Sequence, residues 1–293
     1  MSELAAVCCY FNPCRYAARR RNYDAFRRRI ERSGVSLLTI ELLFGEDDKS
    51  ELGGHGDVIT LLGGDVMWQK ERLLQYGIDL LIADSQTAVA WLDADIVFGQ
   101  LDWHESVLRQ LEHFDCVQTF DRLVSYHGPG YRTSIATAKD PKSLSAGGGW
   151  AATCEFWRRV ELYQHCIVGG GDTMMAKVFL EFGQENPRIW SWQFNGPRMQ
   201  GMNADFREHV IAWARRSWGP WRVGCTDEVT AYLLPHGTRS NRQYGARHKI
   251  LDDFRPLSDI KLGPQGAWQW GSCKPDLHQS IANYFLGRKE DEV

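Results

Sequence analysis

The stretch Val89-Ala90-Trp91-Leu92-Asp93-Ala94-Asp95-Ile96-Val97-Phe98 places two aspartates between two apolar runs. The first run, Ala88 to Leu92, has the length and composition of a buried strand, so Asp93 and Asp95 are expected at its carboxyl end. Two carboxylates one residue apart form a compact set of oxygen ligands that suits Mn²⁺ or Mg²⁺ bridging to a diphosphate. Because an Asp-x-Asp pair also occurs as a turn or a helix cap, its role depends on the sequence around it.

Short apolar runs alternate with helical patterns on the amino-terminal side of this pair. The predicted strands are Leu4 to Tyr10, Ser36 to Leu43 and Val58 to Leu62, and the predicted helices run from about Arg15 to Ser33 and from Asp65, which is placed to cap its helix. Strands that alternate with helices predict an α/β fold with a mostly parallel central sheet flanked by helices. Ligands bind beyond the carboxyl ends of such strands, where Asn12 and Asp93 fall.

The sequence after about residue 120 is less regular. A long loop rich in Gly, Ser and Pro is expected from Phe120 to Gly149. Around and beyond this loop, the predicted elements are helices at Trp103 to His113, Cys154 to Gln164, Thr173 to Phe182 and Ala204 to Arg216, and strands at Cys116 to Phe120 and Thr230 to Leu234. Neither an internal repeat nor a low-complexity linker divides the sequence, so we expect one domain over residues 1–293.

The composition is that of an ordinary globular protein. Of the 293 residues, 43% are hydrophobic and 24% are charged, and a net charge of -3 gives no overall attraction to nucleic acid or to an anionic membrane. No apolar stretch reaches the roughly 18 residues needed to span a bilayer, and no signal peptide is recognisable, so we expect a cytoplasmic protein. The eight cysteines are then expected to be reduced thiols.

Two glycine-rich segments in the second half are candidates for contact with a ligand. In Gly147-Gly148-Gly149-Trp150, glycine lets the backbone approach a ligand and the indole can stack on a flat ring, so Gly148, Gly149 and Trp150 are candidates for ligand contact. A flexible loop is the alternative for this segment. In Gly169-Gly170-Gly171-Asp172, a carboxylate follows at the expected start of a helix, where it could act as a general base, as a helix cap, or as both.

The segment from Val89 to Phe98 resembles the DxD strand of GT-A glycosyltransferases, in which the aspartate pair holds a metal ion and a nucleotide sugar. The resemblance covers roughly residues 5 to 250 and includes the helical stretch Val66 to Leu74 and both glycine-rich segments. It implies a GT-A (Rossmann-like) fold with a nucleotide-sugar-binding half at about 1–120, an acceptor and metal-completing half at about 121–250 and a C-terminal extension at about 251–293. It also implies a hexosyl- or pentosyltransferase that uses Mn²⁺ or Mg²⁺.

The resemblance further implies roles for individual residues, and it places Gly148, Gly149 and Trp150 at an acceptor site where the indole stacks on a sugar ring. Asp172 would be the general base of an inverting enzyme, and His236 would be the third metal ligand beside Asp93 and Asp95. The residues expected to bind the nucleotide sugar are Phe11, Asn12 and Arg15 at the base and ribose, Lys70 near a phosphate or the sugar, Asp93 near the ribose, and Arg239 and Arg242 at the diphosphate. By analogy with the family, the donor is expected to be a UDP-sugar and the acceptor a hydroxyl group of a glycan.

Three alternatives stay open at this point. A non-catalytic carbohydrate-binding protein would use the aromatic surface that twelve tryptophans can supply, without a base or a diphosphate clamp. A nucleotidyltransferase shares a doubly wound sheet and paired carboxylates, but Phe11-Asn12-Pro13-Cys14 is a poor match to its glycine-rich, basic phosphate loop. Modified DNA as the acceptor is permitted by the arginine-rich helix, although the acidic net charge argues against nonspecific affinity for DNA.

Overall fold

A seven-stranded sheet forms the centre of the protein in the computed structural model, which describes residues 4–45, 47–83, 88–125, 130–136, 144–180 and 202–292. In spatial order its strands are β11 (Val223–Cys225), β6 (Cys116–Gln118), β10 (Gly149–Ala152), β4 (Ala88–Leu92), β1 (Leu4–Phe11), β2 (Ser36–Leu43) and β3 (Val58–Leu62). Neighbouring strands are parallel except where β10 pairs with β4 and β6. The predicted mostly parallel α/β sheet is therefore confirmed.

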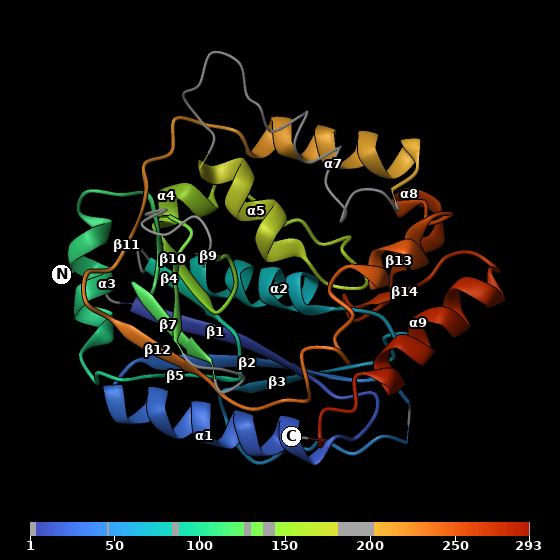
Figure 1. Cartoon of the computed structure of the whole chain (residues 1–293), viewed down its shortest axis with the longest axis horizontal. Coiled ribbons are helices and arrows are strands. Elements are labelled where there is room, and N and C mark those ends of the chain that lie inside the picture. The colour runs from blue at the N-terminus through green and yellow to red at the C-terminus, as the bar shows by residue number, and fades with distance from the viewer. Residues whose placement is uncertain are drawn as a thin grey trace.

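Helices cover both faces of this sheet (Figure 1). Alternate residues of β1 point to opposite faces, so Val7 joins the core shared with α2 (Lys70–Ala83), whereas Ala6 and Cys8 join the core shared with α1 (Ala17–Ser33). The first core also includes α4 (Cys154–Trp157), α5 (Gly171–Leu180), α7 (Ala204–Ser217) and α9 (Pro275–Gly287), and the second includes α3 (Trp103–Leu111). Burial from both sides explains why the central strands read as continuous apolar runs.

Three strands of a second, five-stranded sheet lie where a long loop was predicted. Its spatial order is β5 (Ile96–Phe98), β12 (Thr230–Leu233), β7 (Arg122–Ser125), β8 (Tyr131–Ser134) and β9 (Leu144–Ser145). β12 pairs antiparallel with β5 and parallel with β7, so a strand from late in the chain lies beside the strand that follows Asp95. The loop prediction was wrong in the described part of residues 121–148, because these short strands bond to partners distant in sequence that local composition does not reveal.

Two predicted helices differ from the observed ones. α2 begins at Lys70 rather than Asp65, because the Asp65 carboxylate accepts a hydrogen bond from the backbone N–H of Trp270 (2.6 Å) instead of capping a helix. The helix predicted to reach Gln164 ends at Trp157, and the backbone N–H of Leu162 donates to the Gln75 side chain (2.8 Å) instead of to a helical carbonyl. In both places, a hydrogen bond to a residue of another part of the chain replaces the helical arrangement that the local pattern predicted.

The last elements of the chain return to the start of the sheet. They are η1 (Ala246–Leu251), α8 (Pro256–Asp259), the antiparallel pair of β13 (Ile260–Leu262) and β14 (Trp268–Trp270), and α9, which packs against η1. The chain then runs back to the beginning of α1, where its C-terminal end is marked (Figure 1). Across the described ranges, no helix combines the length and the apolar character needed to cross a membrane.

Candidate functional site

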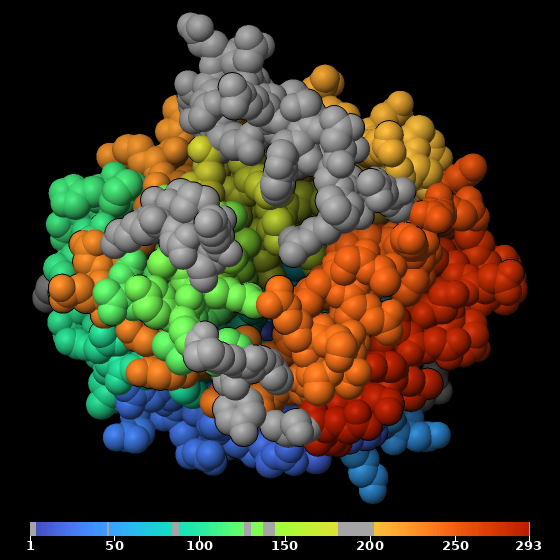
Figure 2. All heavy atoms as spheres, in the orientation of Figure 1, coloured from blue at the N-terminus to red at the C-terminus, as the bar shows by residue number. Residues whose placement is uncertain are grey.

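A cavity of about 890 Å³ opens at the carboxyl ends of β1 and β4. Figure 2 shows this face of the molecule, hollowed between the green surface of the second sheet and the orange surface of the segment after β12. Among the described residues, seven cationic side chains line the cavity against four carboxylates, an excess of three positive charges: Arg19, Lys70, Arg132, Lys177, Arg242, Arg247 and Arg288 against Asp93, Asp95, Asp172 and Glu290. Such an excess favours an anionic ligand.

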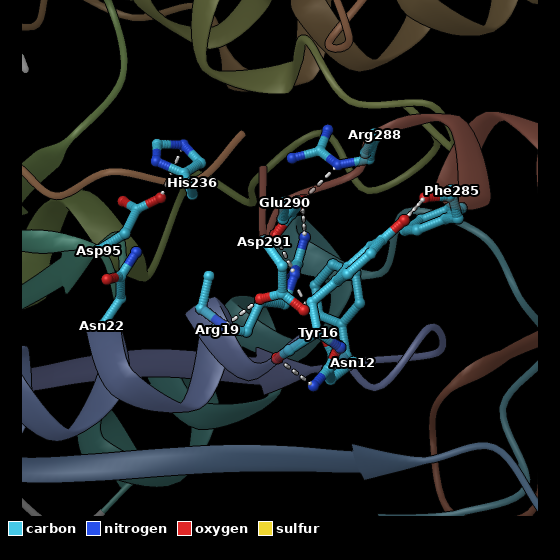
Figure 3. Close-up of polar contacts among 12 residues, drawn as sticks. Asn12, Tyr16, Arg19, Asn22, Asp95, His236, Phe285, Arg288, Glu290 and Asp291 are labelled. Atoms are coloured by element: carbon cyan, nitrogen blue, oxygen red, sulfur yellow. Dashed lines mark hydrogen bonds and ion pairs between the residues drawn. The ribbon is translucent and has the colours of Figure 1, made fainter. Parts of the chain in front are cut away.

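Asp95 and His236 face each other in this cavity (Figure 3). The pairing of β5 with β12 brings them together, with His236 Nε2 3.1 Å from Asp95 Oδ2 and His236 Nδ1 2.6 Å from the Leu234 carbonyl oxygen. A carbonyl oxygen can only accept a hydrogen bond, so Nδ1 carries a proton and Nε2 is directed at the carboxylate. Because two lone pairs repel each other at this distance, a proton or a metal cation belongs between Nε2 and Asp95.

The donor atoms of this pair fit a divalent metal ion. Asp95 Oδ1 is buried and has no hydrogen-bond partner among the described residues, which leaves a ligand oxygen available. Mg²⁺ and Mn²⁺ are held by one or two protein side chains together with phosphate oxygens of a substrate. Burial raises the pKa of Asp95, and the Arg242 guanidinium opposes that rise.

Asp93, predicted as a third metal ligand, has other partners. Its Oδ1 pairs with Lys70, and its Oδ2 accepts a hydrogen bond from the backbone N–H of Gly148 (3.0 Å). Burial raises the pKa of Asp93 to about 6, against the opposing effect of the Lys70 ammonium. No three His, Cys, Asp or Glu side chains converge as a metal site within the part of the chain that the structure describes, and of the three predicted ligands Asp95 and His236 are in contact with each other.

Lys70 links Asp93 to Asp172. Its Nζ pairs with Asp93 Oδ1 and lies 2.9 Å from both carboxylate oxygens of Asp172, which belongs to the first turn of α5. Burial alone would lower the pKa of Lys70, but Asp172, Asp93 and Glu71 hold it well above its usual value. The lysine is therefore a buried cation inside the cavity.

Gly148, which was predicted to line an acceptor site, lines the cavity. Its φ of 104° suits glycine, and a Cβ there would lie 2.8 Å from the Phe120 ring. The Gly148 carbonyl accepts a hydrogen bond from the Asp93 N–H (2.8 Å), so two hydrogen bonds join this glycine to the first aspartate.

Gly149 and Trp150 were predicted at the acceptor site but lie inside the sheet. Trp150 is 3% exposed, its ring stacks on Trp91 with centroids 6.3 Å apart, and its indole N–H donates to the Ala146 carbonyl (2.8 Å). A Cβ on Gly149 would lie 2.5 Å from Thr119 Oγ1, so this glycine serves close packing. The prediction that the indole stacks on a sugar is contradicted, because β10 runs between β4 and β6 and directs the ring into the core.

Arg242 lies beside the Asp95 and His236 pair. Its Nη2 donates to the His236 carbonyl (3.2 Å) and its Nη1 to the Tyr244 hydroxyl (2.5 Å), while its buried Nε has no hydrogen-bond partner among the described residues. A buried guanidinium with an open N–H suits a phosphate ligand.

Phe11 also lines the cavity, and its ring meets the Trp68 ring edge to face with the centroids 5.5 Å apart.

Three residues predicted to bind the donor lie outside this cavity. The Asn12 side chain orders the turn after β1, accepting from the Tyr16 N–H (2.9 Å) and donating to the Tyr16 carbonyl (3.1 Å). Arg15 is half exposed and pairs with Asp48 (2.6 Å), and Arg239 is exposed. The prediction failed for Arg15 because the segment after β2 supplies a nearby carboxylate that holds the guanidinium away from the cavity.

The segment after α9 forms one wall of the cavity, and no local pattern indicated this. Glu290 is 1% exposed and accepts hydrogen bonds from Arg19 (2.7 and 2.9 Å) and from Arg288 (2.5 Å), as Figure 3 shows. Asp291 accepts from the first two backbone N–H groups of α1, at 3.1 and 2.6 Å. Arg19 also donates to the Phe11 carbonyl (2.8 Å), so this network, which we call the C-terminal latch (Arg19, Arg288, Glu290 and Asp291), fixes the end of β1.

Replacing Glu290 by glutamine is expected to lower the free energy of unfolding by about 3 kcal/mol at pH 7. Burial alone would raise the pKa of Glu290, but Arg19 and Arg288 lower it to about 2 from 4.5. The stabilisation is therefore complete above pH 4.5 and is lost as the pH falls towards 2. Urea unfolding should show a smaller difference between wild type and Glu290→Gln at pH 3.5 than at pH 7.

The matched control for this prediction is Glu292→Gln. Its carboxylate pairs with Lys289 at 3.1 Å, and its side chain is 59% exposed, so its replacement should leave the stability unchanged at both pH values. Equal stabilities of Glu290→Gln and the wild type at pH 7 would show that the C-terminal latch does not stabilise the fold.

Comparisons with known proteins find distant structural similarity alone. No protein-family model matches the sequence, and no curated protein matches it. A putative nucleotide-diphospho-sugar transferase from Desulfovibrio desulfuricans is 14% identical with a TM-score of 0.37, covering 78% of this chain and 83% of that one. A mutant Drosophila β1,4-galactosyltransferase 7, solved with manganese, UDP-Gal and xylobiose, is 10% identical with a TM-score of 0.43, covering 96% and 99%.

A nucleotidyltransferase is also among the similar structures. A putative glucose-1-phosphate thymidylyltransferase from Bacillus anthracis, in complex with sucrose, is 9% identical with a TM-score of 0.36, and the match covers 90% of this chain and 98% of that one. At these identities and TM-scores the similarity does not decide between sugar transfer and nucleotidyl transfer. The choice rests on the residues of the cavity.

Proposed function

We propose that this chain is a GT-A-type glycosyltransferase that moves a sugar from a nucleoside-diphosphate sugar, expected to be a UDP-sugar, to a hydroxyl group of an acceptor. One observation carries the proposal: a single cavity contains Asp95, His236 and Arg242 together with Asp172. The first three side chains suit a metal-bound diphosphate, and the fourth suits the acceptance of a proton. A sugar-binding protein without catalytic activity would need neither.

Asp172 would act as the general base in an inverting displacement. It takes the proton from the acceptor hydroxyl while that oxygen forms a bond to the anomeric carbon, and the bond between this carbon and the diphosphate oxygen breaks. The bonding electrons leave with the diphosphate, and the planar guanidinium of Arg242 binds the resulting charge.

Lys70 would be a positioning residue in this reaction. It contacts both oxygens of Asp172, so one of these oxygens must exchange Lys70 for the acceptor hydroxyl before proton transfer. Its two contacts hold the Asp172 carboxylate in one orientation at the cavity. Because Lys70 also pairs with Asp93, it couples the position of the base to that of the first aspartate.

Asp95 and His236 would hold Mn²⁺ or Mg²⁺. When bound, such an ion supplies positive charge to the diphosphate, both in the donor and as it leaves. Asp93, held by Lys70 and the Gly148 N–H, is proposed to contact the ribose, and Phe11 to contact the nucleotide. The acceptor is proposed to be a glycan whose hydroxyl group enters beside Asp172.

A screen of nucleotide sugars tests this proposal. The protein is incubated with UDP-, GDP- and ADP-sugars and Mn²⁺, and release of the nucleoside diphosphate is measured without an acceptor, because slow hydrolysis needs none. We expect at least one UDP-sugar to be hydrolysed at least about tenfold faster with Mn²⁺ than with EDTA. Release of pyrophosphate from a nucleoside triphosphate and a sugar phosphate would identify a nucleotidyltransferase instead. Glycan binding without hydrolysis or affinity for nucleotide would identify a carbohydrate-binding protein.

A further inference from the structure

A second buried arginine, Arg247 of η1, lines the same cavity and has no role in the mechanism above. It is 6% exposed, and its Nε has no hydrogen-bond partner among the described residues. Within the described ranges it also forms no ion pair with a carboxylate. A buried cation without a counter-ion is costly, which is the state expected of a group that binds an anionic ligand.

Aromatic side chains and a second arginine hold Arg247 in place. The Tyr284 hydroxyl oxygen accepts hydrogen bonds from Arg247 Nη1 (2.9 Å) and from Arg288 Nη1 (2.8 Å), and the Tyr244 ring lies 5.1 Å from the Arg247 guanidinium. Arg288 shares Glu290 with Arg19, so this group contains three guanidiniums against one carboxylate. The guanidinium of Arg247 is thus rigidly placed, and the positive charge around it is not neutralised by the protein.

The contacts of Arg247 associate it with the proposed general base, Asp172, rather than with the Asp95 and His236 pair. A Cβ on Gly169, whose φ is 83°, would lie 3.4 Å from both terminal nitrogens of Arg247, so the guanidinium rests on the glycine-rich segment that leads to Asp172. Arg242, in contrast, donates to the His236 carbonyl and contributes to the electrostatics of Asp95. Both arginines lie against Tyr244, but Arg242 bonds to the His236 backbone, whereas Arg247 rests on the glycine-rich segment.

We propose that Arg247 forms an anion subsite for the acceptor, so that the preferred acceptor carries a carboxylate or a phosphate group near the hydroxyl that receives the sugar. The inference rests on the proposed function, because the acceptor side is defined by Asp172. It extends that function by assigning the acceptor a chemical class. An arginine fork binds either anion through two parallel N–H groups, which gives orientation as well as affinity.

Matched acceptor probes test this subsite. Methyl glucoside, methyl glucuronide and methyl glucoside 6-phosphate share one ring and differ at a single carbon, so their affinities isolate the contribution of the anion and separate carboxylate from phosphate. Isothermal titration is done with and without UDP and Mn²⁺. We expect the wild type to bind at least one of the anionic glycosides at least about tenfold more tightly than the neutral one.

Variants of Arg247 and Arg242 test which of the two arginines causes the preference for an anionic glycoside. Arg247→Gln should abolish it while changing the affinity for UDP by less than about twofold. Arg247→Lys should restore part of it, because lysine keeps the charge without the planar fork. Arg242→Gln should do the reverse, weakening UDP binding and preserving the preference for an anionic glycoside. Circular dichroism of each variant checks that it is folded.

The outcomes separate this inference from the proposed function. Equal affinity of the wild type for all three glycosides, or a preference that survives in Arg247→Gln, would overturn the subsite. Equal loss of UDP affinity in Arg247→Gln and Arg242→Gln would also overturn it, since Arg247 would then bind the diphosphate. If the wild type lacks Mn²⁺-dependent UDP binding but keeps an Arg247-dependent preference for an anionic glycoside, the subsite stands and the glycosyltransferase proposal fails.

Discussion

Replacing Asp172 by asparagine is expected to lower the rate of sugar transfer about 10²- to 10⁴-fold, because an amide cannot take the proton from the acceptor hydroxyl. The affinity for nucleoside diphosphate should stay within about twofold of wild type, since asparagine keeps the shape of the side chain and Lys70 keeps its second partner, Asp93. Transfer is measured with the donor found in the nucleotide-sugar screen, and affinity by titration of UDP in the presence of Mn²⁺.

The matched control for this substitution is Asp205→Asn. Asp205 is 59% exposed and pairs with Arg255 (3.3 Å), so its replacement should leave both transfer and UDP affinity unchanged. Transfer at the wild-type rate in Asp172→Asn would remove the base assignment. Parallel loss of transfer and UDP affinity would instead show that Asp172 supports the donor site through Lys70.

The second large effect is expected for Asp95→Ala. Removing an outer-shell partner of a metal ligand commonly costs 10- to 100-fold in metal affinity, so loss of a direct ligand should lower Mn²⁺-dependent UDP binding by at least about 100-fold. The residual, metal-independent binding through Arg242 should persist. Isothermal titration of UDP with Mn²⁺ and with EDTA measures both components.

Asp24→Ala is the control for this variant, because Asp24 lies on α1 with a side chain 34% exposed and pairs locally with Arg20. It should bind UDP and Mn²⁺ like the wild type. If Asp95→Ala keeps the same ratio of UDP affinities with and without Mn²⁺, then the Asp95 and His236 pair does not hold the ion. The 3.1 Å contact between the two side chains would then be an ordinary ion pair with a protonated imidazole.

Local pattern predicted the parts of the site that depend on a single strand or turn. Asp93 and Asp95 follow a strand that is buried on both faces, so their place at the sheet edge follows from the apolar run before them. His236 follows β12, which the sequence also predicted as a strand. The sequence could not show that Asp93 is bound by Lys70, because that contact depends on how α2 packs on the sheet.

The failures share one physical cause, which is that a side chain's direction depends on its neighbours in space. Trp150 was assigned to a sugar on the basis of flanking glycines, but insertion of β10 between two strands turns the ring into the core. Arg247 and Glu290 gave no signal, since a charged residue in an irregular stretch is usually exposed. Their burial arises from partners as far as 271 residues away in sequence.

The C-terminal latch also bears on how the protein is made. Arg19 belongs to α1, whereas its partner Glu290, and Arg288, which also donates to Glu290, follow α9. During synthesis from the amino terminus, the strands β1, β2 and β4 can pair early, but the end of β1 and the start of α1 lack these partners until residue 291 has emerged from the ribosome. A stalled or shortened nascent chain would therefore contain most of the sheet without this wall of the cavity, and ligand binding would report that synthesis has passed residue 291.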